Sequence, residues 1–469
     1  MRVVNYKMNY FNLGFNKKLF FLVAFLSTIL TIDFNAQSGY EYQFLLPLSY
    51  FVSYILAPPI KNCGIGYLVL NGVWLIRYCV CPVLIRLSDY KIRYYSDVTD
   101  KDLYIALFLM IVELWLSIFT CYFFYNKGKK NCKDNMVYDK ADKINKKHGN
   151  ISFIVILVML ILTTLVVIFD RNALNSFNFI LNNNYVSKGN SKYGISILII
   201  SWTKMLLTVF LLSKFADKER QKHNPLNIIL SICMVIISIS LFSGMSRNEI
   251  FIEAFAYISL LLYLFPQYKK QIFIVCFSSL VIVLLLITVL RFFYTRNIVE
   301  GLKNYRLKNI ASMLNVYFAG QQNVAIGIKS LRLYRHLYNI MTIFKDLLAN
   351  TIFFNRYVSN IMGTVEIFNL AVYGHSEWAD QIPPMITQSF ALFNILCVFI
   401  LIFLMYFILK TEKLILNASN AFGVYVFSFI SINLALYSPG NITILFTAFT
   451  NRFIPLLIMY KLSLIRITK

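Results

Sequence analysis

The chain has 469 residues, of which 58% are hydrophobic, 16% aromatic and 14% charged, and its mean hydropathy is +0.64. Soluble domains carry roughly a quarter charged residues, so these values exclude a soluble globular protein. The formal net charge of +24 would by itself favour a nucleic-acid-binding protein. The basic residues, however, lie mainly in short connections between apolar runs, where the positive-inside rule accounts for them. We therefore expect no nucleic acid partner.

Apolar runs recur along the whole chain at the length that a helix needs to cross the roughly 30 Å hydrocarbon core of a bilayer. The first run, Leu19–Thr31, follows several basic residues and precedes no clear small-residue cleavage site, so we expect a retained span rather than a signal peptide. The sequence thus predicts an all-α fold, a polytopic integral membrane bundle of about twelve transmembrane helices. The expected spans are 19–31, 44–60, 63–85, 103–125, 151–169, 195–213, 226–243, 250–265, 271–290, 390–409, 417–437 and 449–466.

The basic connections between these runs predict the orientation of the chain. If the N-terminus is cytoplasmic, the C-terminus and all the lysine-rich connections fall on the cytoplasmic side, as the positive-inside rule requires. These connections are 127–150, 214–225, 266–270 and 410–413. The long segment Arg291–Gln388 then faces the periplasm or the cell exterior.

This orientation divides the chain into three parts. Residues 1–290 form the first nine spans, residues 291–388 form one large outer loop, and residues 389–469 form the last three spans. The loop contains ten Lys and Arg, five Asp and Glu, and two of the four histidines. Apolar residues at helical spacing predict amphipathic helices in 311–326 and 328–354, and the Pro383–Pro384 pair ends any helix before the next span.

Three expected spans are weak because of the ionisable side chains Arg77, Glu113 and Lys204. A charge at membrane depth is costly unless it faces the bundle interior or a wet cavity, so each of these residues is a candidate for a functional role. Arg77 fits equally well as a long side chain that extends to the membrane interface. The eight cysteines show neither metal-site spacing nor a disulfide framework, and we expect no metal and no cofactor.

Three groups of polar residues are candidates for a site on the outer face. In the turn Ser243–Glu249, Arg247 would lie at the membrane boundary, where a guanidinium can bind a lipid phosphate through two parallel hydrogen bonds. An ordinary polar hairpin explains this turn equally well. Arg291 and Arg296 lie at the outer end of the ninth expected span, where the positive-inside rule does not account for them, which favours anion binding.

The third group is His375 with Glu377 and Asp380. A histidine near carboxylates can act as a general base, although solvation at the surface is the commoner outcome for such a cluster. Trp378 could stack on a sugar ring or anchor the loop at the interface. Arg332 and Arg335, three residues apart in the loop, are expected on a solvated helix face.

Three segments resemble motifs of one family. Ser243–Glu249 (SGMSRNE), Tyr317–Ala325 (YFAGQQNVA) and Asp380–Ser389 (DQIPPMITQS) are similar, in this order, to the SGSRxE, YFxGxxNVA and GDxIPPxIxQS segments of the bacterial O-antigen polysaccharide polymerases, the Wzy family. Ala379 stands where that family more usually has glycine. The expected spans and the single large outer loop agree with the same family.

The resemblance implies a GT-C-like membrane enzyme of the bacterial inner membrane, a glycosyltransferase whose substrate is an oligosaccharide linked to undecaprenyl pyrophosphate. The growing glycan would leave its lipid carrier on the periplasmic face and join an incoming lipid-linked repeat unit. Arginines would stabilise the departing pyrophosphate, and a histidine or carboxylate would serve as the base. The catalytic residues expected are Arg247, Arg291, His375 and Asp380, and the substrate-binding residues are Arg296, Glu249, Asn323 and Trp378. The expected partners are membrane lipid and, from the same pathway, a chain-length regulator and a flippase.

Other functions remain open at this point. An O-antigen ligase shares the lipid pyrophosphate donor and the large outer loop but uses lipid A-core as its acceptor. A lipid-linked oligosaccharide flippase would have short loops on both sides, which the long segment Arg291–Gln388 opposes. A transporter would show an inverted pair of interrupted helices in matching halves, and we find none in the sequence.

Overall fold

A computed structural model describes residues 17–57, 64–90, 98–133, 153–175, 177–179, 194–222, 224–243, 247–276, 278, 307–349, 351, 354–358, 360–376 and 382–464. Apart from one pair of three-residue strands, the regular structure in these residues is helical, which confirms the expected all-α class.

The N-terminal and central helices are α1 (Lys17–Thr31), α2 (Leu45–Leu56), α3 (Ile65–Leu75), α4 (Cys81–Leu87), α5 (Asp100–Lys133), α7 (Phe153–Phe169), α8 (Asn172–Asn175), α9 (Gly194–Lys222), α10 (Leu226–Ser240) and α11 (Arg247–Leu264). The later helices are α14 (Leu307–Tyr317), α15 (Gln321–Tyr334), α16 (Ile340–Leu348), α17 (Thr364–Tyr373), α18 (Met385–Phe393), α19 (Cys397–Leu416), α20 (Ala421–Leu436), α21 (Ile442–Ala448) and α22 (Ile454–Ser463). Two π-helical turns, η1 (Ile76–Val80) and η6 (Phe449–Phe453), join α3 to α4 and α21 to α22.

The remaining elements are short. The 3₁₀ turns are η2 (Pro266–Tyr268), η3 (Arg335–Leu337), η4 (Asn355–Val358) and η5 (Asn394–Leu396). The strands β1 (Phe177–Phe179) and β2 (Leu241–Ser243) pair antiparallel, with Phe177 opposite Ser243.

Four helical stretches in the described residues are long and apolar enough to cross a membrane: Ile65–Leu87, Asp100–Asn126, Gly194–Lys222 and Ile442–Ser463. A fifth follows if the bent pair Asn248–Leu264 and Pro266–Cys276, whose axes differ by 113°, is one span. Shorter apolar helices, among them α1, α2, α7, α10 and α20, fall on other expected spans. The chain is therefore a helical membrane protein, and the full count of about twelve spans stays a prediction.

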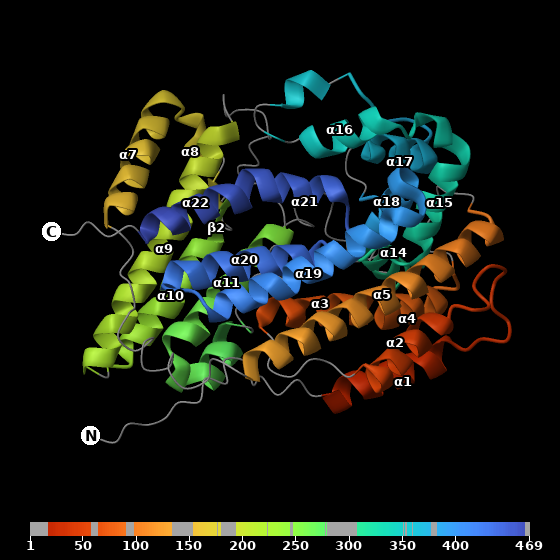
Figure 1. The fold of residues 1–469 in the computed structure, drawn as a ribbon, viewed down its shortest axis with the longest axis horizontal. Helices are drawn as coiled ribbons and strands as arrows, with labels where there is room; N and C mark the ends of the chain where they lie inside the picture. Colours follow the sequence, from red (N-terminus) through yellow and green to blue (C-terminus); the bar gives the residue numbers. More distant parts are fainter. Residues whose placement is uncertain are drawn as a thin grey trace, which may run out of the picture.

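Helix α20 lies at the centre of the bundle. It packs against α3, α11 and α19, and α19 in turn packs against α5. Nearly every side chain of α20 is buried, as expected for a helix that is apolar on all sides. Figure 1 shows α3, α5, α19 and α20 passing through the middle of the molecule, with α14 to α17 gathered at one end and α7 to α10 at the other.

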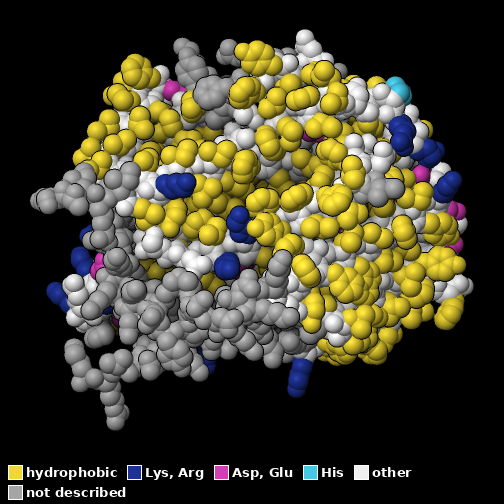
Figure 2. Space-filling view, in the orientation of Figure 1, with side chains coloured by type: hydrophobic (Ala, Val, Ile, Leu, Met, Phe, Trp, Pro, Cys, Tyr) yellow, Lys and Arg dark blue, Asp and Glu magenta, His cyan; other side chains and the backbone are white. Residues whose placement is uncertain are grey.

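Hydrophobic side chains cover most of the surface seen in Figure 2. On α7 they include Leu157, Ile161 and Phe169, all exposed, which is the pattern of a helix that faces lipid. Lysine and arginine side chains, together with a histidine, gather at the edge of this view next to α15 and α17. A broad apolar surface is what a membrane-embedded protein requires.

Two of the ionisable residues expected in spans are partners of each other. The guanidinium of Arg77, in η1, donates from Nη1 to Oε1 of Glu113 at 2.8 Å, and its Nη2 lies 2.7 Å from Oε2. The Nε of Arg77 donates to the carbonyl of Ala319 at 3.0 Å. Both charged side chains are almost fully buried, at 3% and 6% exposed. The alternative that Arg77 extends to the interface is therefore wrong, because a buried carboxylate neutralises it in place.

The helices of the long loop have other bounds than the sequence predicts. The first expected helix is interrupted after Tyr317 and α15 begins at Gln321, because Ala319 adopts a left-handed conformation with φ of 48°. Gly320 is required at this turn, since a Cβ there would lie 2.4 Å from Oδ1 of Asn315. The second expected helix is divided in two, because Asn339 caps the start of α16 with its side chain. The described residues of 307–348 thus form three helices, α14, α15 and α16, in place of the two predicted for 311–354.

We predict that Arg77→Met lowers the free energy of unfolding by about 3–5 kcal/mol, because it leaves the Glu113 carboxylate buried without a counter-ion. The double variant Arg77→Met/Glu113→Met should recover a large part of this loss. Thermal unfolding of the purified protein in detergent measures both effects. Arg86→Met is the matched control, because the Arg86–Asp33 pair is partly exposed and such pairs contribute about 0–1 kcal/mol. Equal losses for Arg77→Met and Arg86→Met would contradict the prediction.

Candidate functional site

Two of the three motif segments meet in space. Asn323, in the first turn of α15, is completely buried, and its Nδ2 donates to the carbonyl of Ile382 at 3.1 Å. One turn further along α15, a Cβ on Gly327 would lie 2.4 Å from Oγ1 of Thr387, so only glycine allows α15 and α18 to approach this closely. Segments about 60 residues apart in sequence therefore form one packed unit.

A buried carboxylate extends this unit to α16, α17 and α21. Asp346 Oδ1 accepts the backbone N–H of Thr364 at 2.9 Å, and Oδ2 accepts from the Thr364 hydroxyl and from Gln388 Nε2, the latter at 2.7 Å. The amide oxygen of Gln388 accepts the backbone N–H of Ile442 at 2.7 Å, at the start of α21. Burial raises the pKa of the Asp346 carboxyl, although these hydrogen bonds oppose the shift. The network fixes four helices relative to one another.

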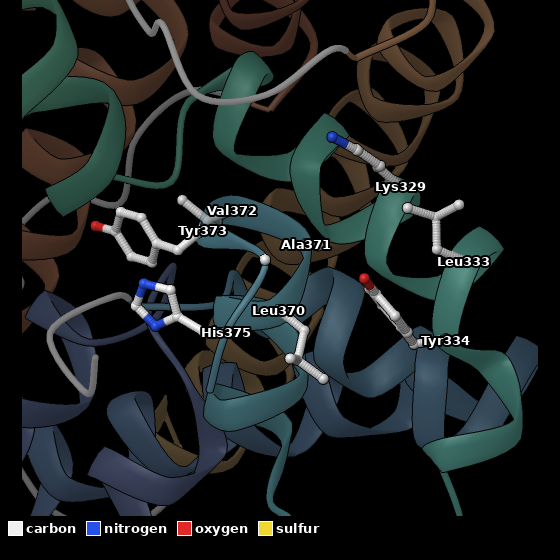
Figure 3. Close-up of a pocket in the computed structure, with 9 residues that line it drawn as sticks. Lys329, Leu333, Tyr334, Leu370, Ala371, Val372, Tyr373 and His375 are labelled. Atoms are coloured by element: carbon white, nitrogen blue, oxygen red, sulfur yellow. The ribbon is translucent and has the colours of Figure 1, made fainter. Parts of the chain in front are cut away.

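An open groove of about 600 Å³ lies between α15 and α17 (Figure 3). Lys329, Leu333 and Tyr334 of α15 line one side, and the C-terminal turn of α17 from Leu370 to Tyr373 lines the other. Gly374 ends α17 with φ of 78°, a conformation that favours glycine.

This reversal of the chain at Gly374 places His375 at the end of the groove. The imidazole stacks on the ring of Tyr373 with centroids 5.8 Å apart, and Figure 3 shows both rings across from Lys329 and Tyr334. A hollow with aromatic walls, a lysine and a histidine is suited to a polar ligand with flat faces, such as a sugar, and its histidine can exchange a proton with a hydroxyl.

A second charged cluster lies at the start of α11. Glu249 accepts from Nη2 of Arg452, in η6, at 2.5 Å, and both side chains are partly exposed, at 29% and 26%. One turn along α11, Glu253 pairs with Nζ of Lys204 at 2.9 Å. This Nζ also donates to the carbonyls of Ser238 and Leu241, where α10 ends. Lys204, a functional candidate because it lies within an expected span, thus has three hydrogen-bond partners among the described residues.

Sequence reasoning missed Arg452, Glu253 and Asp346. Arg452 falls within the last expected span, 449–466, and Glu253 within the eighth. The rule that singled out Arg77 therefore applied to both, because an ionisable residue in a span needs a partner or a wet cavity. Asp346 gave no such signal, since a carboxylate in a polar loop is expected to be solvated.

The predicted site residues separate into three sets. His375 lines the groove, Asn323 is a buried connecting residue, and Glu249 is bound to Arg452. Arg247 is the first residue of α11, and its side chain lies outside the described part of the structure. The last set lies outside the described residues and consists of Arg291, Arg296, Trp378 and Asp380. Glu377 lies outside them as well.

The described residues do not bring His375 and Glu249 together. His375 follows α17 at one end of the molecule, and Glu249 lies on α11, beside the centre of the bundle (Figure 1). The two would have to act at different parts of one substrate. Arg332 is 46% exposed, as expected for a solvated face. It also donates to the buried carboxylate of Asp102 at 2.7 Å, a contact that the sequence did not predict and that holds α15 against α5.

No family model, curated protein or solved structure matches this chain. Among the residues that the structure describes, no group of three or more His, Cys, Asp or Glu side chains is arranged to hold a metal ion. The fold and composition define a helical membrane protein. At one end of its bundle, buried polar contacts join α15, α16, α17 and α18.

We predict that the wild-type protein loses stability relative to Asp346→Asn as the pH rises. The pKa of Asp346 in the folded protein is raised above its ordinary 3.8, so the unfolded chain releases this proton first. The stabilising contribution is complete below the ordinary pKa and is lost as the pH rises through the raised one. Thermal unfolding of both proteins in detergent between about pH 4 and pH 7 measures the difference.

Asp33→Asn is a control for which the change of stability with pH should have the opposite sign. The hydrogen bond from Tyr90 lowers the pKa of Asp33, so the wild type should gain stability relative to this variant as the pH rises through the ordinary pKa range of aspartate. A difference between wild type and Asp346→Asn that stays constant with pH would contradict the assignment of a raised pKa.

Proposed function

We propose that this protein polymerises the lipid-linked repeat units of O-antigen or a similar surface polysaccharide. The growing glycan is transferred from undecaprenyl pyrophosphate to an incoming repeat unit on the same lipid carrier. The observation that carries the proposal is the contact of Asn323 with Ile382. It joins two segments that resemble one polymerase family, and it places them beside a groove that ends at His375.

The proposed reaction needs a base for the acceptor and positive charge for the leaving group. The acceptor hydroxyl attacks the anomeric carbon of the donor sugar, and the bond from that carbon to the pyrophosphate oxygen breaks. His375 takes the hydroxyl proton. The departing pyrophosphate gains negative charge, which fixed guanidinium groups stabilise. Arg247 and Arg291, with Arg296, stay the residues predicted for this role, and Asp380 and Trp378 stay predicted site residues.

The proposed setting is the inner membrane of a bacterium, with about twelve spans, both termini cytoplasmic and the segment Arg291–Gln388 in the periplasm. The lysine-rich connections support this orientation, and helices begin and end close to most of the expected spans in the described residues. A flippase would deliver the lipid-linked units to the outer face, and a chain-length regulator would act beside the polymerase.

Deletion of the gene in its own host tests the reaction class. Surface glycan separated on a gel should lose its long ladder and leave lipid A-core that carries a single repeat unit. Uncapped core with accumulated lipid-linked polymer would instead indicate a ligase. Uncapped core with single lipid-linked units held on the inner face would indicate a flippase.

We predict that His375→Ala slows polymerisation by about 10²- to 10⁴-fold, the usual contribution of a general base. The assay is the length ladder formed by purified protein from lipid-linked repeat units of its host. His336→Ala is the matched control, because His336 is the other described histidine of the loop and is exposed in η3. The prediction fails if the two variants polymerise equally fast.

A further inference from the structure

Two arginines in the described bundle lie in π-helical turns. Arg77 is in η1, between α3 and α4, and Arg452 is in η6, between α21 and α22. Each faces a glutamate on a neighbouring helix, Glu113 on α5 and Glu249 on α11. A π-turn holds one residue more than the regular helix and frequently marks a functional position, so the differences between the two pairs are informative.

The Arg77 pair is closed. Both terminal nitrogens of Arg77 face the Glu113 carboxylate, its Nε bonds the carbonyl of Ala319, and almost none of either charged side chain is exposed. All three nitrogens of Arg77 lie inside the bundle, and no ligand could reach this guanidinium without breaking the bundle. Arg77 is therefore a structural cation.

The Arg452 pair is open. One nitrogen of Arg452 bonds one oxygen of Glu249, and the guanidinium makes no other hydrogen bond with the described residues. About a quarter of each side chain is exposed, within a stretch apolar enough to span a membrane. A guanidinium in such a position needs a polar partner on its exposed side, because hydrocarbon cannot solvate it.

Of the two cations in this cluster, Arg452 is the one whose carboxylate partner an incoming anion can replace. Lys204 is held by Glu253 and by the carbonyls of Ser238 and Leu241, so its charge and that of Glu253 neutralise each other. Glu249 is held by Arg452 alone among the described residues. An incoming anion would have to displace one carboxylate contact, after which Glu249 could turn to the exposed side.

We propose that Arg452 binds a phosphate group of the lipid-linked substrate, and that Glu249 is the internal counter-ion which holds this position until phosphate displaces it. A phosphate accepts two parallel hydrogen bonds from the planar guanidinium, where Glu249 accepts one, so exchange increases the number of charge-assisted bonds. The inference rests on the proposed function for the identity of the lipid, and on the geometry of η6 and α11 for the site.

The test measures binding of undecaprenyl pyrophosphate to the purified full-length protein in nanodiscs of zwitterionic lipid. Arg452→Gln should weaken binding by about 10- to 100-fold, the loss of a charge-assisted pair of bonds. Glu249→Gln should tighten binding by about threefold or more, because the competing carboxylate is gone. Arg452→Lys keeps the charge but not the planar fork, and should bind with intermediate affinity.

Arg86→Gln is the matched control. Arg86 pairs with Asp33, and those side chains are 30% and 24% exposed, close to the values for Arg452 and Glu249. Loss of a surface guanidinium there should leave affinity unchanged. An equal loss in Arg86→Gln would overturn the proposal, because binding would then depend on net charge rather than on this site.

The remaining outcomes separate the two proposals. If Glu249→Gln weakens binding as much as Arg452→Gln, the pair is structural and the exchange is refuted. If the wild type and Arg452→Gln bind equally well, the inference fails while the polymerase assignment stands. If the wild type does not bind undecaprenyl pyrophosphate, the polymerase assignment fails as well. Inorganic pyrophosphate that binds as tightly as the lipid would overturn the assignment to a lipid-linked ligand.

Discussion

The buried ion pair of Arg77 and Glu113 is the interaction on which the rest of the arrangement depends. It neutralises two charges in the interior of an apolar bundle, and through the carbonyl of Ala319 it also fixes the turn between α14 and α15. That turn has a left-handed residue and a glycine pressed against Asn315, so it would be strained without support. The first turn of α15, which carries Asn323, is consequently positioned by a contact inside the membrane bundle.

From this anchor, polar contacts position the helices of the loop in sequence. Arg332 holds α15 to Asp102 of α5, Asn323 holds it to the segment before α18, and Gln388 joins α18 to Asp346 and to α21. These contacts involve side chains or backbone groups that are mostly shielded from water, where an unmade hydrogen bond costs about 1–3 kcal/mol. Polar contacts therefore join these helices beside the groove in addition to their apolar packing.

The sequence predicted the class and the position of most helices, because apolar runs and basic connections follow from the bilayer itself. It did not predict which charges pair, since Arg77 and Glu113 belong to different helices and only the packing brings them together. Glu249 was singled out without Arg452, which lies about 200 residues away in the chain. The division of 307–348 into three helices depended on a left-handed alanine and on the Asn339 cap, and neither changes the apolar periodicity.

The groove and the Arg452–Glu249 pair lie apart, and described contacts connect the helices near them. Gln388 accepts the first backbone N–H of α21, and Arg452 follows Ile442 by ten residues along the same helical stretch, a distance of about 15 Å at the rise of a helix. The Gln388 bond to the first residue of α21 and the helical stretch from Ile442 to Arg452 thus connect α18 to the arginine pair through described contacts.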